Sequence, residues 1–364
     1  MTATKATGVI ARPGDTIGIL GGGQLGRMLA IAAADLGLDV HIFTPEEDSP
    51  ASRVAKRTWV ASFDDRDALR EFAASITVAT IEFENVPVDA VDLIEDEGVP
   101  VRPNGETLSR AQDRLAEKTF FREIGIEPAP FARIDHPSEI QDALTALGGS
   151  GVLKSRFAGY DGKGQIRLKG NIQPYPAWAE VGSKMAILEA WIEHAGEISV
   201  IAARTATGDF VPYDPPENDH SGGILRRSVF PSSASPAMIE EAKRLAKKLA
   251  DELDYVGVLA LELFMTKDGK LLANEFAPRV HNSGHWTQDA CFTGQFEQHI
   301  RAVCGWPLGD PTRHSDGEML NLLGEDANAW EQHLAEGAKL HLYGKRRAIS
   351  GRKMGHITKL KPRS

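Results

Sequence analysis

Two glutamates are expected to face each other on a β-hairpin. The chain from residue 258 to residue 276 has the pattern of two apolar strands joined by a turn with the dipeptide Asp268-Gly269. A two-residue loop at this dipeptide sets the pairing of the strands. Counting back along both strands then places Glu262 directly opposite Glu275.

Such a pair of carboxylates predicts a metal ion. Like charges directly opposite on a sheet repel, and a carboxylate among apolar residues is costly without a partner. A divalent cation would remove the conflict, because carboxylate, water and phosphate oxygens are the ligands that Mg²⁺ accepts. The alternative is an edge hairpin whose two glutamates are simply solvated.

A glycine-rich loop, residues 21–26 (GGGQLG), lies between an expected strand at residues 16–20 and an expected helix that begins near residue 27. Its spacing matches a dinucleotide-binding fingerprint. A dehydrogenase would also need an acidic residue at the end of the second strand, and only Glu46 is near, beyond Pro45. The loop alone therefore indicates a helix N-terminus that offers N–H groups to an anion, with a purely structural turn as the alternative.

A second glycine-rich loop, residues 159–164 (GYDGKG), lies between two short strands. Three glycines in six residues allow the backbone to close over a ligand, and its N–H groups can hold phosphate oxygens. Lys154 and Lys163 add positive charges. The pattern favours a mobile lid over phosphates, and a solvated hairpin is the alternative.

The segment 277–286 follows the hairpin and is dense in hydrogen-bonding side chains. His281 and His285 are four residues apart, a spacing that some zinc sites use on a helix. Pro278 and Gly284 argue against a regular helix there, so substrate recognition is the favoured interpretation. A cationic cluster at residues 351–356 (GRKMGH) suits an anionic ligand, with a solvated basic tail as the alternative.

Composition narrows the class of protein. The 364 residues have a net charge of −10, which argues against a nucleic-acid binder or a membrane-surface protein. Two cysteines exclude a disulfide scaffold, and no apolar run approaches the roughly 20 residues of a spanning helix. We expect a cytoplasmic enzyme with no redox cofactor.

The order of elements predicts several domains. Strands near residues 16–20, 40–43, 58–61 and 77–81 alternate with helices in a doubly wound α/β unit. A helix over residues 109–124 leads out of it. Short strands at 152–154 and 165–168 form a small β-rich lid, and a long helix over residues 237–253 precedes the hairpin.

Taken together, these segments resemble the ATP-grasp superfamily and, within it, the family of 5-(carboxyamino)imidazole ribonucleotide synthases. The resemblance covers nearly the whole chain. It rests on residues 22–28 (GGQLGRM), 159–165 (GYDGKGQ), 274–288 (NEFAPRVHNSGHWTQ) and 351–356 (GRKMGH).

The resemblance implies a mixed α/β and α+β architecture. The expected parts are a Rossmann-like pre-ATP-grasp domain (1–110), a β-rich lid subdomain (111–183), a central domain with the metal and substrate sites (184–315) and a β-rich C-terminal tail (316–364). The implied reaction carboxylates 5-aminoimidazole ribonucleotide with bicarbonate, through carboxyphosphate, and releases ADP and phosphate. The product is 5-(carboxyamino)imidazole ribonucleotide, an intermediate of purine (IMP) biosynthesis.

The resemblance also implies a role for individual residues. Those expected to bind ATP are Arg114, Lys154, Gly159, Gly162, Gly164, Gln165, Glu189, Ala190, Trp191, Ile192, Glu197, His220 and Asn274. Those expected to bind the ribonucleotide are Gly23, Gln24, Leu25, His281, Asn282 and Arg352. Those expected to act in catalysis are Tyr160, Asp161, Lys163, Arg279 and Lys353, and Glu262 and Glu275 are expected to bind the metal.

The expected cofactors are ATP and Mg²⁺, for which Mn²⁺ could substitute. The expected partners are a second copy of the chain and, functionally, the mutase that uses the product. Three rival interpretations stay open at this point. They are a nicotinamide dehydrogenase, another ATP-grasp ligase or transferase with a different acceptor, and a non-catalytic ATP-binding module.

Overall fold

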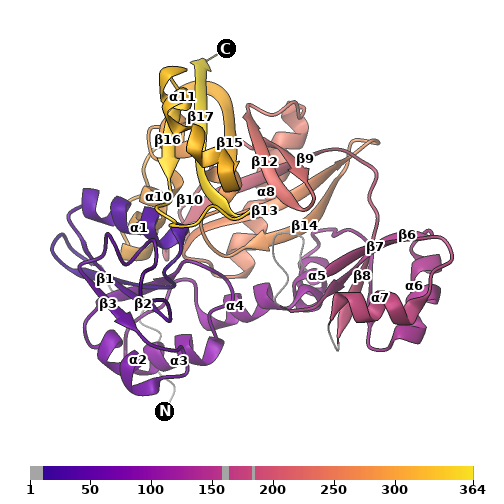
Figure 1. Cartoon of the computed structure of the whole chain (residues 1–364), viewed down its shortest axis with the longest axis horizontal. Helices are drawn as coiled ribbons and strands as arrows, with labels where there is room; N and C mark the ends of the chain where they lie inside the picture. Colours follow the sequence, from indigo (N-terminus) through magenta and orange to yellow (C-terminus); the bar gives the residue numbers. More distant parts are fainter. Residues whose placement is uncertain (1–10, 158–163, 183–184, 364) are drawn as a thin grey trace.

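The structure is a computed structural model that describes residues 11–157, 164–182 and 185–363. The described strands form three sheets: a four-stranded first sheet, a four-stranded small sheet and a nine-stranded large sheet. Figure 1 shows the first and small sheets at opposite ends of the molecule, with the large sheet between and above them. The expected mixture of α/β and α+β architecture is confirmed.

The first sheet is parallel, with the strand order β3-β2-β1-β4. Its central strand is apolar and buried, as expected for a sheet that helices cover on both faces. The expected Rossmann-like unit is confirmed. Its elements are β1 (Thr16–Leu20), α1 (Gln24–Asp35), β2 (Asp39–Thr44), β3 (Arg57–Val60), α2 (Arg66–Ala73), β4 (Val78–Ile81) and α3 (Val88–Asp96).

The helix expected over residues 109–124 is wrong as a single helix. Two helices are present, α4 (Gly105–Gln112) and α5 (Arg114–Glu123), and the chain breaks between them at Asp113, which is extended (φ −114°, ψ 107°). The Asp113 carboxylate accepts a 3.0 Å hydrogen bond from the N–H of Leu115 and so caps α5. The same carboxylate binds the guanidinium of Arg156. A break therefore lies where α5 leaves the first domain.

The small sheet is antiparallel, in the order β5-β8-β6-β7. Its helices pack on an apolar core that includes Leu144, Leu153 and Leu188. The elements of this part are β5 (Phe131–Ile134), η1 (Pro137–Glu139), α6 (Ile140–Ala146), β6 (Ser150–Ser155), β7 (Gln165–Lys169), α7 (Pro174–Val181) and β8 (Ala186–Ala190).

The large sheet is antiparallel, in the order β14-β13-β9-β11-β12-β15-β17-β16, with β10 paired to β9. Its strands are β9 (His194–Arg204), β10 (Phe210–Pro212), β11 (Glu217–Ser221), β12 (Ile224–Phe230), β13 (Gly257–Thr266), β14 (Leu271–Ala277), β15 (Ser315–Leu323), β16 (Lys339–Leu342) and β17 (Lys353–Pro362). The helices of this region are α8 (Pro236–Glu252), η2 (Asn282–Gly284), α9 (Thr287–Ala290), α10 (Gln295–Cys304), η3 (Gly324–Ala329) and α11 (Trp330–Ala335).

Sheet membership differs from the proposed domain boundaries at two places. Strand β8 begins beyond the boundary at residue 183 but pairs with β5 and β6 of the small sheet. The tail from residue 316 is β-rich as expected, but β15 and β17 extend the large sheet through β12. We retain the four domains as a proposal, with the tail continuous with the central sheet.

Two buried apolar clusters support the large sheet. One is shared with the first domain, since Met28 and Leu29 of α1 lie in the same cluster as Phe296 and Ile300 of α10. The other contains residues of α5 and α8 together with β9, β13 and β14, and Phe121 of α5 makes an edge contact with Phe276. Helix α5 is thus packed directly against the hairpin that carries the two glutamates.

We expect Asp113→Ala to destabilise the protein by more than the loss of a helix cap. Asp65→Ala is the matched control, because Asp65 caps α2 and accepts a hydrogen bond from the N–H of Ala68. A lost cap costs about 1 kcal/mol. Asp113→Ala should cost about 1.5 kcal/mol more, since it also removes the charged partner of Arg156. Urea unfolding measures both costs. Equal costs would contradict a stabilising contact between Asp113 at the start of α5 and Arg156 next to the small sheet.

Candidate active site

A cleft of about 670 Å³ lies between the sheets. It gathers side chains from β6, β8, β9, β13, β14 and β17 and from the start of α5. The predicted site residues that line it are Arg114, Lys154, Gln165, Glu189, Ala190, Trp191, Ile192, Glu197, His220, Glu262, Asn274, Glu275, Arg279, His281, Asn282 and Lys353.

The hairpin between β13 and β14 has a different turn from the one predicted. The loop has three residues instead of two, because Thr266 pairs with Lys270 through a 2.9 Å hydrogen bond from its N–H to the carbonyl of Lys270. Gly269 has φ +82°, a left-handed conformation that closes such a loop. The predicted two-residue loop at Asp268-Gly269 is therefore wrong, and the strands start their pairing one residue out of the expected register.

A β-bulge restores the expected register further along the hairpin. Leu263 pairs with Ala273, whereas Leu261 pairs with Phe276, so Glu262 lies opposite two residues, Asn274 and Glu275. The extra residue on β14 compensates for the longer loop. The two glutamates consequently face each other, although the prediction reached this result with a wrong turn.

The charges around the two carboxylates differ. Burial and the charge of Glu275 raise the pKa of Glu262. Burial alone would also raise the pKa of Glu275, but the positive charges of Arg114, Lys154 and Lys118 outweigh it and lower that pKa. Arg114 Nη1 lies 3.2 Å from Glu275 Oε2. The pair therefore holds one firmly ionised carboxylate beside one that takes up a proton more readily.

Glu262 is held by a histidine of the segment predicted to recognise substrate. His281 Nε2 lies 3.2 Å from Glu262 Oε1. Burial and the charges of Arg279 and Lys353 keep the pKa of His281 well below its usual value, so the ring is neutral. A neutral His281 that accepts from the N–H of Ser283 at Nδ1 donates its Nε2–H to Glu262.

The nucleotide side of the cleft carries a buried cluster of charges. Glu189 Oε2 lies 3.0 Å from Lys154 Nζ and 3.4 Å from Lys118 Nζ. Burial opposes ionisation of Glu189, but the two lysines lower its pKa to about 2. Glu189 is therefore ionised, and it holds Lys154 at the position predicted for a phosphate contact.

Two backbone N–H groups of the segment predicted to bind adenine already donate hydrogen bonds within the protein. Strand β8 ends at Ala190, and Trp191 and Ile192 follow the strand instead of lying in it. The N–H of Ala190 donates to Pro130, and the N–H of Trp191 donates to Ser150. These two N–H groups are correspondingly not available to an adenine ring.

Glu197 and His220 lie together on neighbouring strands. Glu197 Oε2 is 2.8 Å from His220 Nδ1. Burial alone would lower the pKa of His220, but the hydrogen bond that it donates to Glu197 and the charge of Glu262 raise it. This pairing accounts for why the two predicted ATP-binding residues lie side by side in the cleft.

The cationic residues predicted to bind the ribonucleotide separate into two groups. Arg279 lines the cleft and forms a bidentate pair with Glu84, with Nε–Oε2 at 2.5 Å and Nη2–Oε1 at 2.9 Å. Lys353 of β17 also lines the cleft. Arg352 precedes β17, is exposed and is not among the residues that line the cleft. Its role in binding the ribonucleotide stays a prediction.

The first glycine loop holds a protein carboxylate. The N–H of Gly23 donates to Glu82 Oε1 at 2.8 Å, and the N–H of Gly26 donates to Glu82 Oε2 at 3.3 Å. A Cβ on Gly23 would lie 2.5 Å from Glu82, which explains the glycine. Gly23, Gln24 and Leu25 do not line the cleft. Glu82 therefore accepts hydrogen bonds from two N–H groups of this loop, which argues against a dinucleotide at the same position. The predicted contact of Gly23, Gln24 and Leu25 with the ribonucleotide stays a prediction.

Several predicted residues lie outside the described part of the chain: Gly159, Tyr160, Asp161, Gly162 and Lys163. At the end of that loop, the carbonyl of Gly164 accepts a 2.9 Å hydrogen bond from the N–H of Ser155. Gln165 follows it, pairs with Lys154 and lines the cleft.

Two residues that sequence reasoning missed hold the bulge. Glu117 and Lys118 are adjacent on α5 and both are buried. The Glu117 carboxyl accepts a 2.7 Å hydrogen bond from the N–H of Phe276. The Lys118 ammonium donates to the carbonyl of Asn274. These contacts clamp the backbone on either side of Glu275.

The arrangement is that of the ATP-grasp class, in which a small antiparallel sheet with a lysine faces a larger sheet with paired carboxylates. Three family models match this chain and support the same class. Residues 15–112 match the ribonucleotide synthetase preATP-grasp domain, and residues 119–296 match the ATP-grasp domain. Residues 318–364 match the phosphoribosylaminoimidazole carboxylase C-terminal domain.

Relatives narrow the class. An N5-carboxyaminoimidazole ribonucleotide synthase from Brucella melitensis is 52% identical over 97% of this chain and 98% of its own. A solved N5-carboxyaminoimidazole ribonucleotide synthetase in complex with ADP has a TM-score of 0.93 and 39% identity, over 97% of this chain and 94% of that one. The chain belongs to the family of N5-carboxyaminoimidazole ribonucleotide synthases, as the resemblance implied.

A second similar structure was solved with bound ligands. The N5-carboxyaminoimidazole synthase from Aspergillus clavatus was solved in complex with ADP and 5-aminoimidazole ribonucleotide. It has a TM-score of 0.88 and 30% identity, and the match covers 96% of this chain and 94% of that one.

We expect the clamp on the bulge to need a hydrogen bond from Phe276 but no charge on Glu117. Burial raises the pKa of Glu117 to about 8, so at neutral pH its carboxyl is protonated. Glu117→Gln can accept the same hydrogen bond and should retain most turnover, whereas Glu117→Ala should lose most of it. Steady-state ADP release measures both, and equal damage by the two substitutions would contradict the clamp.

Lys118→Met should be more damaging, because it leaves the Asn274 carbonyl and the Glu189 carboxylate without their buried partner. An unsatisfied buried group costs about 1–3 kcal/mol. We expect lower stability in urea together with lower turnover. Lys169→Met, which removes an exposed lysine at the end of β7, is the control, and it should leave both measurements unchanged.

Proposed function

We propose that this chain catalyses the ATP-dependent carboxylation of 5-aminoimidazole ribonucleotide with bicarbonate, in purine biosynthesis. The products are 5-(carboxyamino)imidazole ribonucleotide, ADP and phosphate. The observation that carries the proposal is the cleft itself. It places buried paired carboxylates beside Lys154 and Arg114 at one end and Arg279, His281 and Lys353 at the other, in a chain of this family.

The end of the cleft around Lys154 would hold ATP. Lys154 and Arg114 supply positive charge for the phosphates, and Glu197 is positioned to accept from ribose hydroxyls. We infer that the adenine edge is recognised by groups of residues 189–192 other than the two N–H groups already bonded within the protein. Residues 159–163 remain the proposed lid over the phosphates.

Glu262 and Glu275 would hold Mg²⁺, or Mn²⁺ in its place. The donor set fits, because the buried Glu262 and the partly exposed Glu275 face each other, offer hard oxygen ligands and repel each other without a cation. When bound, the ion neutralises charge on the phosphates during transfer to bicarbonate. The protein supplies the alignment through the bulge and the contact of His281 with Glu262.

The other end of the cleft would hold the ribonucleotide. Arg279, His281, Asn282 and Lys353 present cationic and hydrogen-bonding groups there. In the family's route, bicarbonate is phosphorylated to carboxyphosphate, and the exocyclic amine of the ribonucleotide attacks the carboxyl carbon or the CO₂ released from it. We retain Tyr160, Asp161 and Lys163 as proposed catalytic residues.

We further propose a cytoplasmic homodimer whose product passes to a mutase. No helix among the described residues is long and apolar enough to cross a membrane. A groove lined by Met28, Ile31, Leu36 and Phe296 lies between α1 and α10, and Ile31 is 44% exposed. Such an exposed apolar groove suits a second copy of the chain. Analytical ultracentrifugation tests the dimer.

ADP release with bicarbonate, with and without 5-aminoimidazole ribonucleotide, tests the function. Lys353→Ala should raise the KM for the ribonucleotide about 10- to 150-fold, since a charge-assisted hydrogen bond contributes roughly 1.5–3 kcal/mol. The KM for ATP should change little. Lys359→Ala on the same strand is the control. A higher KM for ATP with an unchanged acceptor KM would move Lys353 to the nucleotide end.

Metal binding should weaken as the pH falls. Burial and Glu275 raise the pKa of Glu262, so a proton competes with the metal close to neutral pH. Because coordination needs the ionised carboxylate, Mn²⁺ affinity should fall between about pH 8 and about pH 6, by up to about tenfold per pH unit. Electron paramagnetic resonance of free Mn²⁺ measures it. Glu262→Gln should flatten the profile, and an unchanged profile would rule out Glu262 as a ligand.

A further inference from the structure

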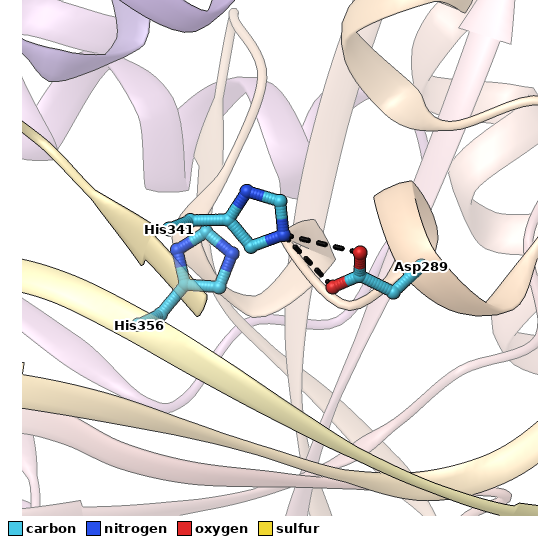
Figure 2. A group of neighbouring side chains, drawn as sticks. All are labelled: Asp289, His341 and His356. Carbon is cyan, nitrogen blue, oxygen red and sulfur yellow. Dashed lines mark hydrogen bonds and ion pairs between the residues drawn. The ribbon is translucent and has the colours of Figure 1, made fainter. Parts of the chain in front are cut away.

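A second group of metal-ligating side chains lies outside the cleft. Asp289 of α9, His341 of β16 and His356 of β17 converge, and one ligand atom from each lies within 4.8 Å of the others. His341 Nε2 is 3.0 and 3.1 Å from the two oxygens of Asp289 (Figure 2). None of the three lines the cleft. One of the three elements, β17, also carries Lys353.

His356 has a buried nitrogen that the protein leaves unsatisfied. The residue is fully buried, and its Nδ1 lies 2.9 Å from the hydroxyl of Tyr343. Its Nε2 has no hydrogen-bond partner among the described residues. Figure 2 shows this ring beside that of His341, with one nitrogen on the side of Asp289. A buried polar atom without a partner is costly, and an ion is one explanation for it.

The hydrogen bond of His356 leaves one of its nitrogens available as a metal ligand. The Tyr343 hydroxyl lies 2.9 Å from Nδ1 and can accept the Nδ1–H of His356, which leaves the lone pair of Nε2 free. Ligating histidines commonly donate their second N–H in this manner.

We propose that Asp289, His341 and His356 bind a divalent transition metal ion such as Zn²⁺. Two imidazoles and a carboxylate form a donor set that Zn²⁺ accepts, with a fourth position for water. The His341 side chain is 28% exposed, so the ion can enter from solvent. The 3.0 Å separation of His341 and Asp289 is close to the roughly 3.3 Å between ligand atoms of a tetrahedral zinc ion. The rings of His341 and His356 are stacked with their centroids 4.6 Å apart, so both rings would turn toward a common ion on binding.

The ion would act as a structural clip. His356 pairs across the sheet with Asn321 of β15, and the Asn321 side chain exchanges hydrogen bonds of 2.8 and 2.9 Å with that of Asn282. Asp289 lies on α9, directly after the segment that carries His281 and Asn282. A metal at this position would join that segment to β16 and β17, and β17 also carries Lys353. It would thereby fix His281 and Asn282 relative to Lys353 at the end of the cleft proposed for the ribonucleotide.

Metal titration of the full-length protein, first stripped with a chelator, tests the proposal. We expect one tight Zn²⁺ site by calorimetry, a visible Co²⁺ spectrum with nitrogen ligation, and a higher melting temperature with Zn²⁺. Asp289→Asn keeps the size of the side chain and should abolish tight binding, as should His341→Ala. Tyr343→Phe should weaken it about 10- to 100-fold.

Two controls separate this site from other histidines and from the cleft. His314→Ala removes an exposed histidine and should retain tight Zn²⁺ binding. Glu262→Gln removes a carboxylate of the cleft and should also retain it. The same Zn²⁺ affinity in Asp289→Asn and the unsubstituted protein would overturn the proposal, as would the absence of tight binding in folded protein. The group would then be an ion pair of His341 with Asp289 beside a neutral ring.

Discussion

Repulsion between Glu262 and Glu275 is the interaction on which the rest of the cleft depends. Burial makes ionisation of either carboxylate costly, and their proximity adds to that cost. The protein compensates on one side, where Arg114, Lys154 and Lys118 keep Glu275 ionised. On the other side, Glu262 has a neutral histidine as its direct partner. The divalent cation that we propose would resolve the remaining conflict.

Holding two repelling groups together requires a rigid backbone. The bulge places both Asn274 and Glu275 opposite Glu262 on the neighbouring strand. Bulges weaken the regular ladder, and here α5 replaces what is lost through Glu117 and Lys118. Because α5 itself is capped by Asp113, which also binds Arg156 of the small sheet, the position of the metal pair is linked to that sheet. Nucleotide-dependent movement of the small sheet would therefore reach the carboxylates.

The sequence predicted the fold class and most of the cleft, because apolar periodicity and long motifs are local features. The facing of Glu262 and Glu275 was predicted although the turn was wrong, since the register error at Asp268-Gly269 and the bulge cancel. The occupant of the first glycine loop could not be predicted, because Glu82 is far from Gly23 in sequence and meets it only through the parallel sheet. Likewise, nothing local in the sequence indicates that Lys118 reaches the carbonyl of Asn274.

The distribution of charge explains how a chain with a net charge of −10 can bind anionic ligands. Two of the cations that line the cleft are held by carboxylates: Lys154 by the buried Glu189 and Arg279 by the partly buried Glu84. These pairs fix the cations in place and reduce their charge toward bulk solvent. A phosphate that enters the cleft meets pre-positioned donors and needs little side-chain ordering, which favours binding. Acidic residues therefore serve in this cleft as supports for the cations that bind phosphate.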